Sequence, residues 1–333
     1  MPANQLFIAW VPFQRRAISM QPYFGYVLKF AKLSFSKKYL RIFEYIAKTF
    51  QTLTWLIRAC PSVIWVQLPP TLILHILFVY KILLNRDCLV IADCHNATFR
   101  KPWVTIPGFK GLLTKCDLVI VHNDDVKQDA LGLGVVYQQL YVLEDPPAVL
   151  GTNVLSKKDN FYIEPWILCP CSFNKDEPIK AILDAARLTP EITFVLTGNK
   201  KRALGNHDLS HLPANIKLPG FLPTETFDKL LTSATIVMGL TILDGIQLSV
   251  ANEAVGVGQA MVLANTNTLK QLFYKGAVYV DPQNARSIAA GCRDAIARHD
   301  ALTSEVFELR EERQNSWLEQ AQKIENVIKI GLN

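Results

Sequence analysis

The chain has 333 residues, a formal net charge of +6 at pH 7 and a mean hydropathy of +0.17. Half of its residues are hydrophobic and 19% are charged, a composition that excludes disordered and collagen-like proteins. The length exceeds that of one ordinary core and favours two domains of about 100–200 residues each.

The basic excess is confined to the first 60 residues. This segment has nine basic side chains and one acidic side chain, a formal charge of +8, and the remaining residues sum to −2. Such asymmetry favours an anionic partner, such as phosphate, nucleic acid or lipid headgroups, and the alternative is a solvated basic face.

The cysteines indicate the cellular compartment, and the apolar stretches indicate whether a helix could span a membrane. Seven cysteines include no C-x2-C pair, so neither a zinc site nor a disulfide framework is expected, and a reducing cytoplasm fits best. The first residues have no signal-peptide pattern. The most apolar stretch, residues 62–84, is interrupted by Pro69 and Pro70, and the apolar run after these prolines is shorter than the ~20 residues of a spanning helix.

Short apolar runs alternate with amphipathic segments along the first 150 residues. The pattern predicts strands over 5–10, 63–68, 88–92, 117–121 and 140–143, and helices over 41–58 and 71–84. Because these strands are apolar throughout and are separated by helical segments, we expect a parallel sheet that is covered on both faces.

Residues 151–165 interrupt this rhythm with proline, glycine and lysine, and are predicted to be a linker. A second series then predicts strands over 166–169, 192–196, 234–238, 261–264 and 278–280, with helices over 176–188, 225–231 and 285–298. The fold class is therefore α/β, with two doubly wound, Rossmann-like domains (1–150 and 166–303) and a final polar helix in 304–333.

Two loops that follow predicted strands of the second domain are suited to a diphosphate. They supply Ser172, Asn174 and Lys175 before one helix, and Asn199 and Lys200 in a second loop with three consecutive cations. The free N–H groups of a helix N-terminus attract anions. Each loop alone could be a plain capping loop, but at one end of one sheet they predict a diphosphate site without a metal.

Three further groups could complete a nucleotide site. Phe221 and Leu222 lie in a proline-rich turn that could read the edge of a base. Asp244 and Gln247 could bind sugar hydroxyls. Glu253, expected to open a helix, could accept two hydrogen bonds from a ribose diol, although it could also simply cap its own helix.

The order of these motifs resembles the nucleotide-binding domain of GT-B glycosyltransferases. T-G-N-K at 197–200, P-G-F-L-P at 219–223 and E-A-x-x-x-G at 253–258 carry the resemblance. It implies two domains that face a cleft, a last helix that returns toward the N-terminal domain, and a ribose held by Glu253. Asp244 matches the family's first acidic residue only if the loop has one inserted residue.

The first domain resembles the acceptor domain of transferases that act on polyprenyl-diphosphate-linked sugars, including the mannosyltransferase that acts on dolichol-linked chitobiose. The apolar strand with a double proline at 63–70 and the D-C-H-N sequence at 93–96 carry this resemblance. It implies that Asp93 or His95 is the catalytic base for an acceptor hydroxyl and that Asn96 contacts the acceptor. A core or capping histidine is the alternative for His95.

The basic segment fits the same interpretation. Arg15 and Arg16 are predicted in the loop after the first strand, where two arginines could bind the diphosphate of a lipid acceptor. Aromatic and basic side chains alternate over residues 23–39, a pattern suited to peripheral contact with anionic lipid.

The expected function is a metal-independent hexosyltransferase of the cytoplasm, peripheral on the inner face of a membrane. It would move a sugar from a nucleoside-diphosphate sugar, of UDP or GDP type, to a hydroxyl of a lipid-linked oligosaccharide or polysaccharide precursor. With inversion Asp93 or His95 acts as base, and with retention they only orient the acceptor.

No metal and no nucleic-acid partner are expected, because D-x-D and nucleic-acid motifs are missing from the sequence. The alternatives are a catalytically silent GT-B binding or scaffold subunit and a soluble transferase with a small acceptor. The sequence makes no prediction of the oligomeric state.

Overall fold

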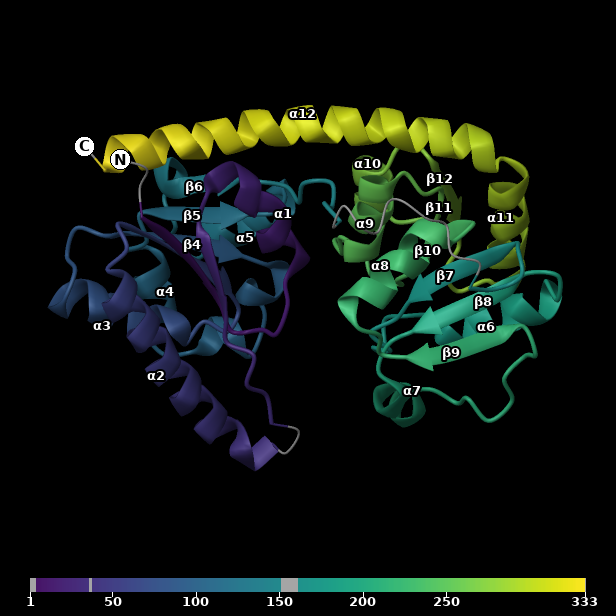
Figure 1. The fold of residues 1–333 in the computed structure, drawn as a ribbon, viewed down its shortest axis with the longest axis horizontal. Coiled ribbons are helices and arrows are strands. Elements are labelled where there is room, and N and C mark those ends of the chain that lie inside the picture. Colours follow the sequence, from purple (N-terminus) through teal and green to yellow (C-terminus); the bar gives the residue numbers. More distant parts are fainter. Residues whose placement is uncertain (1–3, 36–37, 151–160, 333) are drawn as a thin grey trace. The chain divides into compact units, whose positions relative to one another are not determined.

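The computed structural model describes residues 4–35, 38–150 and 161–332. The chain divides into two compact units (Figure 1), which we call the N-unit (residues 1–146 and 315–333) and the C-unit (residues 147–314). Of the predicted linker, residues 151–160 lie outside the described residues, and so does Lys37 of the predicted lipid-contacting stretch. Each unit is built around one parallel sheet.

The N-unit has a six-stranded sheet of order β2-β1-β3-β4-β5-β6, in which all neighbours are parallel. The strands are β1 (Gln5–Ala9), β2 (Val27–Phe30), β3 (Val63–Leu68), β4 (Leu89–Cys94), β5 (Leu118–Val121) and β6 (Leu140–Val142). Strands β3 and β4 are buried along their whole length, as expected for a sheet covered on both faces. The parallel α/β prediction is therefore confirmed.

Helices alternate with these strands in the described part of the N-unit. The α-helices are α1 (Arg15–Phe24), α2 (Arg41–Ala59), α3 (Ile73–Leu83), α4 (Phe109–Leu113) and α5 (Asp124–Gly132). Short 3-10 helices lie between them: η1 (Lys38–Leu40), η2 (Asn96–Phe99), η3 (Trp103–Thr105) and η4 (Tyr137–Gln139).

The prediction of a loop at Arg15 and Arg16 is wrong, because these residues form the first turn of α1. The Gln14 side chain caps the helix by accepting a hydrogen bond from the N–H of Ala17 at 2.6 Å, and Gly25 ends it with a φ of 69°. The paired arginines and Pro22 inside the helix hide an amphipathic pattern in the sequence.

The C-unit repeats the architecture with sheet order β12-β11-β10-β7-β8-β9, again with parallel neighbours. Its strands are β7 (Trp166–Pro170), β8 (Thr193–Thr197), β9 (Ile216–Gly220), β10 (Ile236–Gly239), β11 (Met261–Ala264) and β12 (Ala277–Val280). Its helices are α6 (Ile179–Leu188), α7 (Lys200–Asn206), α8 (Thr224–Ser233), α9 (Ser249–Val257), α10 (Asn267–Leu272) and α11 (Ala285–Ala297).

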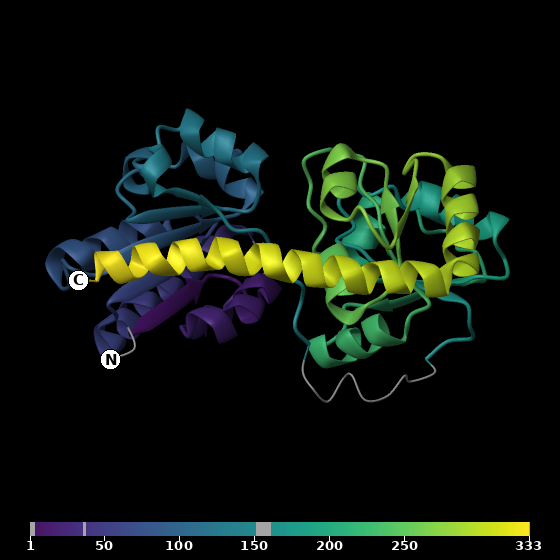
Figure 2. The same cartoon turned by 90° about the horizontal axis from the view of Figure 1, so that it is seen from above.

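The last helix, α12 (His299–Gly331), begins five residues before its predicted start and is drawn in yellow in Figure 2. Its second half belongs to the N-unit. There Trp317, Ala321, Ile324 and Ile328 are buried in one cluster with residues of the sheet such as Trp65, at the spacing of one helical face. None of the helices in the described residues combines the length and the apolar character that a membrane-spanning segment requires.

Candidate functional site

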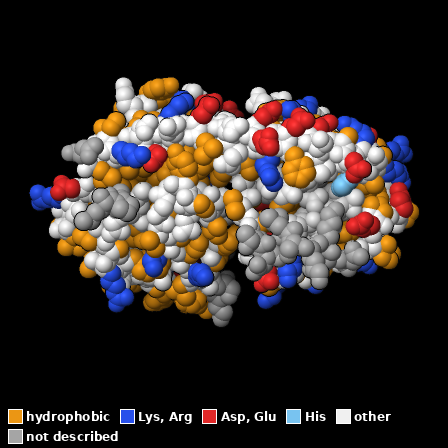
Figure 3. Space-filling model, turned by 45° about the horizontal axis from the view of Figure 1, so that its top comes forward, with side chains coloured by type: hydrophobic (Ala, Val, Ile, Leu, Met, Phe, Trp, Pro, Cys, Tyr) orange, Lys and Arg blue, Asp and Glu red, His pale blue; other side chains and the backbone are white. Residues whose placement is uncertain are grey.

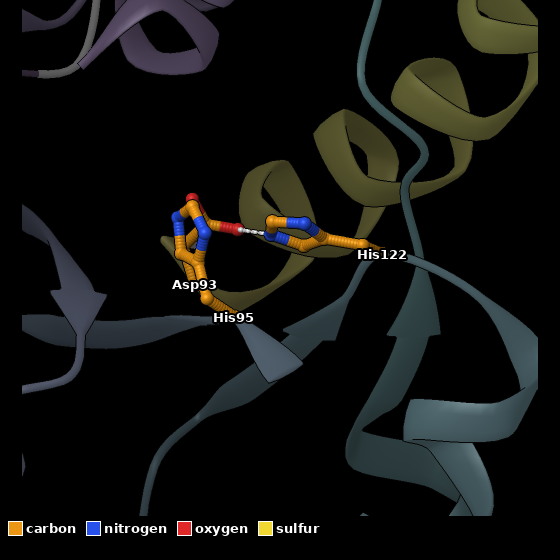
Figure 4. Close-up of side chains that lie close together, drawn as sticks. All are labelled: Asp93, His95 and His122. Carbon is orange, nitrogen blue, oxygen red and sulfur yellow. Dashed lines mark ion pairs between the residues drawn. The ribbon is translucent and has the colours of Figure 1, made fainter. Parts of the chain in front are cut away.

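A cluster of polar side chains lies at the carboxyl ends of three neighbouring strands of the N-unit. Asp93 is in β4 and His95 follows it, His122 follows β5, and Asp145 follows β6. The fifth member, Arg16, comes from the first turn of α1. Figure 4 shows Asp93, His95 and His122 of this cluster. Ligands of parallel sheets bind at this edge, so the cluster is a candidate functional site.

Arg16 is the centre of this cluster. Its Nε donates to both carboxylate oxygens of Asp93 at 3.2 Å, and its Nη1 donates to Asp145 at 2.6 Å and to the carbonyl of Glu144 at 2.8 Å. Its Nη2 donates to Asp93 at 3.2 Å and to the carbonyl of Leu143 at 2.9 Å. All five N–H groups of the guanidinium are thus bonded inside the protein.

Because these N–H groups are already bonded, the expected role of the two arginines in binding an acceptor diphosphate has to be revised. Arg16 is buried and has no N–H left for an acceptor diphosphate, so its contribution is to hold the two carboxylates in place. Arg15 is half-buried and its guanidinium lies 5.0 Å from the centre of the Phe13 ring.

The two carboxylates of the cluster stay ionised. Burial alone would raise the pKa of Asp93, but the charge of Arg16 and the adjacent imidazole of His122 hold that pKa well below its usual range. Burial opposes ionisation of Asp145 as well, yet His122 and Arg16 lower its pKa. A carboxylate with so low a pKa is a poor proton acceptor at neutral pH, so Asp93 is suited to positioning its neighbours.

His95 is neutral at physiological pH. Burial, followed by the charge of His122, lowers its pKa to about 3. The amide nitrogen of Gln14 lies 3.1 Å from Nε2 of His95, and an amide nitrogen can only donate. Nε2 therefore accepts, and the proton of the neutral ring resides on Nδ1. Asn96 follows His95 as the first residue of η2 and is half-buried.

His122 and Asp145 are the two members of the cluster that sequence reasoning missed as site residues. His122 is the more informative of the two. Its Nε2 lies 3.6 Å from Asp93 Oδ1 and its Nδ1 lies 3.6 Å from Asp145 Oδ1, so two carboxylates flank the ring. Nε2 is buried without a hydrogen-bond partner, and the ring contacts that of His95 with centroids 4.3 Å apart. Its position directly after an apolar strand could have identified it, because it shares the sheet edge with Asp93.

A metal ion is one possible ligand of this cluster. Within the described part of the chain, Asp93, His95 and His122 each bring one potential ligand atom within 4.8 Å of the others, and two imidazoles with a carboxylate are a common donor set for transition metals. However, Arg16 already donates to both oxygens of Asp93, so a cation would compete with the guanidinium. The absence of a metal stays a prediction.

In the C-unit, the two predicted diphosphate loops lie side by side at the ends of β7 and β8. Arg202 Nη1 donates to the carbonyl of Ser172 at 3.3 Å and to Asn174 Oδ1 at 3.4 Å, which links the loops. Ser172, Asn174 and Lys175 are exposed. The N–H groups of Ser172 and Asn174 donate to Glu177 at 2.9 and 3.3 Å, so the side chains rather than these N–H groups face solvent.

Gly198 permits this close approach. A Cβ atom at this position would clash with the carbonyl oxygen of Cys171, and the φ of 134° at Gly198 disfavours any other residue. The next residue, Asn199, caps α7 by accepting from the N–H groups of Lys201 and Arg202. Lys200 follows with its stem against Gly220. A pocket of about 180 Å³ beside Lys200 has mostly apolar walls, including Phe173, Leu204 and Leu218.

The remaining predicted nucleotide residues of the C-unit follow β9, follow β10 or lie in α9. Phe221 is exposed directly after β9 and Leu222 is half-buried. Asp244 accepts hydrogen bonds from the N–H of Gly245 and from the N–H and hydroxyl of Thr268, and the backbone bond of Thr268 is the largest cause of its lowered pKa. One carboxylate oxygen is therefore engaged in holding α10.

The prediction that Glu253 opens a helix is wrong. Helix α9 begins at Ser249, which places Glu253 in the second turn, where it is buried. Gln247 precedes the helix and is half-buried. The short loop before α9 holds Gly245 and carries no strong capping residue, so the sequence alone does not mark where the helix starts.

Comparison with known proteins identifies the fold. No family model and no curated protein sequence matches the chain. HepE from Anabaena in complex with UDP-glucose is similar with a TM-score of 0.71 and 12% identity, over 97% of this chain and 100% of that chain. Sucrose-phosphate synthase from Thermosynechococcus elongatus is similar with a TM-score of 0.68 and 13% identity, over 98% of both chains.

A third similar structure is the catalytic domain of starch synthase IV from Arabidopsis thaliana bound to ADP and acarbose, with a TM-score of 0.67 and 10% identity over 100% of each chain. At these identities the similarity establishes architecture. The chain therefore has the fold of GT-B glycosyltransferases, two α/β units each built on a six-stranded parallel sheet.

Proposed function

We propose that the chain is a glycosyltransferase, a hexosyltransferase that uses a nucleoside-diphosphate sugar of UDP or GDP type. The observation that carries the proposal is the similarity of nearly the whole chain to structures that contain UDP-glucose or ADP. The diphosphate-suited loops at the ends of β7 and β8 lie on a sheet edge of the kind that binds ligands in such folds.

The donor would bind in the C-unit. Lys175 and Lys200, together with Ser172, Asn174 and Asn199, would neutralise the diphosphate and stabilise it as it leaves with growing negative charge. Phe221 and Leu222 would contact the base, Glu253 the ribose, and Asp244 and Gln247 the sugar.

The acceptor hydroxyl would be activated by an imidazole of the N-unit. In an inverting reaction the acceptor oxygen bonds to the anomeric carbon, the bond from that carbon to the diphosphate oxygen breaks, and the hydroxyl proton goes to His122. His95, whose pKa is lowered to about 3 and whose Nε2 accepts from Gln14, would orient the acceptor. Asp93, with Arg16 and Asp145, is a positioning residue that fixes His122. In a retaining reaction the proton would leave with the diphosphate, and the same groups with Asn96 would orient the acceptor.

The proposed acceptor is a lipid-linked oligosaccharide or polysaccharide precursor, at an anionic membrane surface on the cytoplasmic side. The charge of +8 in the first 60 residues supports an anionic partner. We propose that the reaction needs no metal, since Lys175, Lys200 and Arg202 supply positive charge beside the donor.

A thermal-shift panel of UDP, GDP and ADP tests the donor site. One of them is expected to raise the melting temperature, and at 100 times its Kd the stabilisation is about 2.7 kcal/mol. Lys200→Ala should weaken that nucleotide about 10- to 100-fold, because a charge-assisted hydrogen bond contributes about 1.5–3 kcal/mol. Lys270→Ala, an exposed lysine of α10, is the matched control. A panel without any shift would contradict the donor site.

A further inference from the structure

Helix α2 is oriented with its polar stripe inward and its apolar stripe outward. The residues at i, i+4, i+8 and i+12 that face the protein are Glu44, Lys48, Thr52 and Leu56, all of which are buried. Three of these four are polar. A surface helix of a globular protein normally buries its apolar stripe, so this orientation needs a specific cause.

Hydrogen bonds and an ion pair fix that orientation. Lys48 Nζ lies 2.7 Å from Glu44 Oε1 and donates to the carbonyl of Trp10 at 3.2 Å. The indole N–H of Trp10 donates to Thr52 Oγ1 at 2.9 Å, and the N–H of Phe35 donates to Glu44 at 3.0 Å. The inward polar stripe is therefore bonded to the end of β1 and to the loop before the helix.

The outward face is apolar and solvent-exposed. Ile42, Phe43 and Phe50 are 68%, 63% and 67% exposed, and Ile46 and Ile57 are also exposed. At 100° per residue, these five side chains fall within an arc of about 100°. We call them the α2 face. A shallow groove of about 450 Å³ opens on it, lined in part by Ile46, Phe50 and Leu72.

Neighbouring segments extend this apolar surface. Tyr80 of α3 donates a hydrogen bond to the carbonyl of Leu56, which places the exposed Val79 and Leu83 of α3 near the end of α2. Phe35 and Tyr39 are exposed just before α2. Soluble monomers rarely expose apolar surface of this extent, and it usually marks an interaction site.

The charged side chains around the α2 face indicate what kind of partner it binds. Lys32, Arg41 and Arg58 are exposed, whereas Glu44, the only acid among the first 60 residues, is buried and paired. Figure 3 shows one face of the molecule, on which hydrophobic side chains lie among both basic and acidic ones. A second copy would bring the same positive rim against itself in a two-fold contact, so charge complementarity favours an anionic surface.

We infer that the α2 face is a membrane-docking surface that inserts its apolar side chains among the headgroups and upper acyl chains of an anionic bilayer. An interfacial helix combines an apolar face, aromatic residues and basic flanks in this way. The inference rests on the proposed function, because a lipid-linked acceptor gives such docking its purpose, and it names the element that makes the contact.

Vesicle flotation tests the inference with full-length protein. The wild type should float with phosphatidylcholine vesicles that contain 30 mol% phosphatidylglycerol, and at least tenfold less with pure phosphatidylcholine. Ile46→Gln/Phe50→Gln should lose at least tenfold in apparent vesicle affinity. Leu188→Gln/Ile330→Gln, which changes two exposed apolar residues on α6 and α12, should float as the wild type does.

Lys32→Gln/Arg41→Gln/Arg58→Gln should lose most of the preference for anionic vesicles. Flotation of the Ile46/Phe50 variant at wild-type level, or no flotation of the wild type, would overturn the inference. So would a wild-type dimer in sedimentation that the Ile46/Phe50 variant abolishes, since the α2 face would then bind a second copy. Nucleotide thermal shifts on the same proteins separate this outcome from the proposed function, because the donor residues lie in the C-unit and should respond unchanged.

Discussion

At the scale of single residues, the arrangement of the candidate site depends on the hydrogen bonds and ion pairs that its buried charged side chains make. Arg16 donates all five of its N–H groups to two carboxylates and two carbonyls. No N–H group of its guanidinium is therefore left to bind a group outside the cluster. That arrangement leaves the imidazoles of His95 and His122 as the side chains of the cluster to which Arg16 does not donate.

Replacing Arg16 should be far more damaging than breaking an exposed ion pair. Arg16→Met leaves Asp93 and Asp145 buried without their partner, which should lower the free energy of unfolding by about 3–5 kcal/mol. Lys81→Met removes a half-exposed partner of Asp117 and should cost about 0–1 kcal/mol. Urea denaturation followed by fluorescence measures both, and equal losses would contradict the structural role of Arg16.

The low pKa of His95 predicts a pH dependence of stability. The unfolded chain binds a proton at His95 with a pKa near 6.5 and the folded chain only near 3. Acidification between these values therefore favours unfolding, by up to about 1.4 kcal/mol per pH unit. His95→Gln removes this contribution, so wild type should lose more stability than the variant between pH 7 and pH 5. Parallel pH curves for the two proteins would disprove the pKa assignment.

At the scale of elements, hydrophobic periodicity predicted most of the strands but few of the polar connections. The apolar runs at 63–68 and 261–264 coincide with β3 and β11. Strand β2 was not predicted because it is a half-exposed edge strand that contains a lysine. Strand β9 was not predicted because Pro219 made its sequence resemble that of a turn. Glu253 was placed at a helix start because no strong capping residue marks Ser249.

At the scale of elements, Gly198 also allows the two donor loops to lie in close contact. Gly198→Ala forces a Cβ against the carbonyl of Cys171 at a positive φ, so it should lower the melting temperature and weaken nucleotide binding. Gly205→Ala is the control, since nothing lies within 4 Å of its added Cβ and alanine favours a helix by about 1 kcal/mol. Similar melting temperatures for the two variants would contradict the close contact of the loops.

At the scale of the whole molecule, the sequence was sufficient for the architecture and insufficient for the site. Two series of apolar strands predicted two parallel α/β units, whereas Asp93 and His95 were predicted only through a resemblance to known acceptor domains, and Asp93 lies inside β4 and not in the loop after it. Arg16 bonds to residues 77 and 129 positions away, and no local pattern signals such a pairing. The inverted orientation of α2 was hidden for the same reason, because distant Trp10 fixes it.

Helix α12 contributes its second half to the core of the N-unit, and this can be tested. Trp317 is buried with its ring at 5.3 Å from that of Tyr23. Trp317→Ala should destabilise by about 3–5 kcal/mol, as large-to-small changes in cores do. The adjacent Leu318 is more exposed, and Leu318→Ala should cost much less. Equal effects in thermal unfolding would contradict the packing of α12 on the N-unit sheet.

The central claim is that the chain transfers sugar from a nucleoside-diphosphate donor. Its most direct test is the release of nucleoside diphosphate from a panel of UDP- and GDP-sugars, in EDTA, with anionic vesicles that carry lipid-linked saccharides. The account predicts release from at least one donor, with transfer of the sugar to the lipid fraction, and a loss of at least tenfold in Lys200→Ala. No release from any donor, with or without added metal, would contradict it.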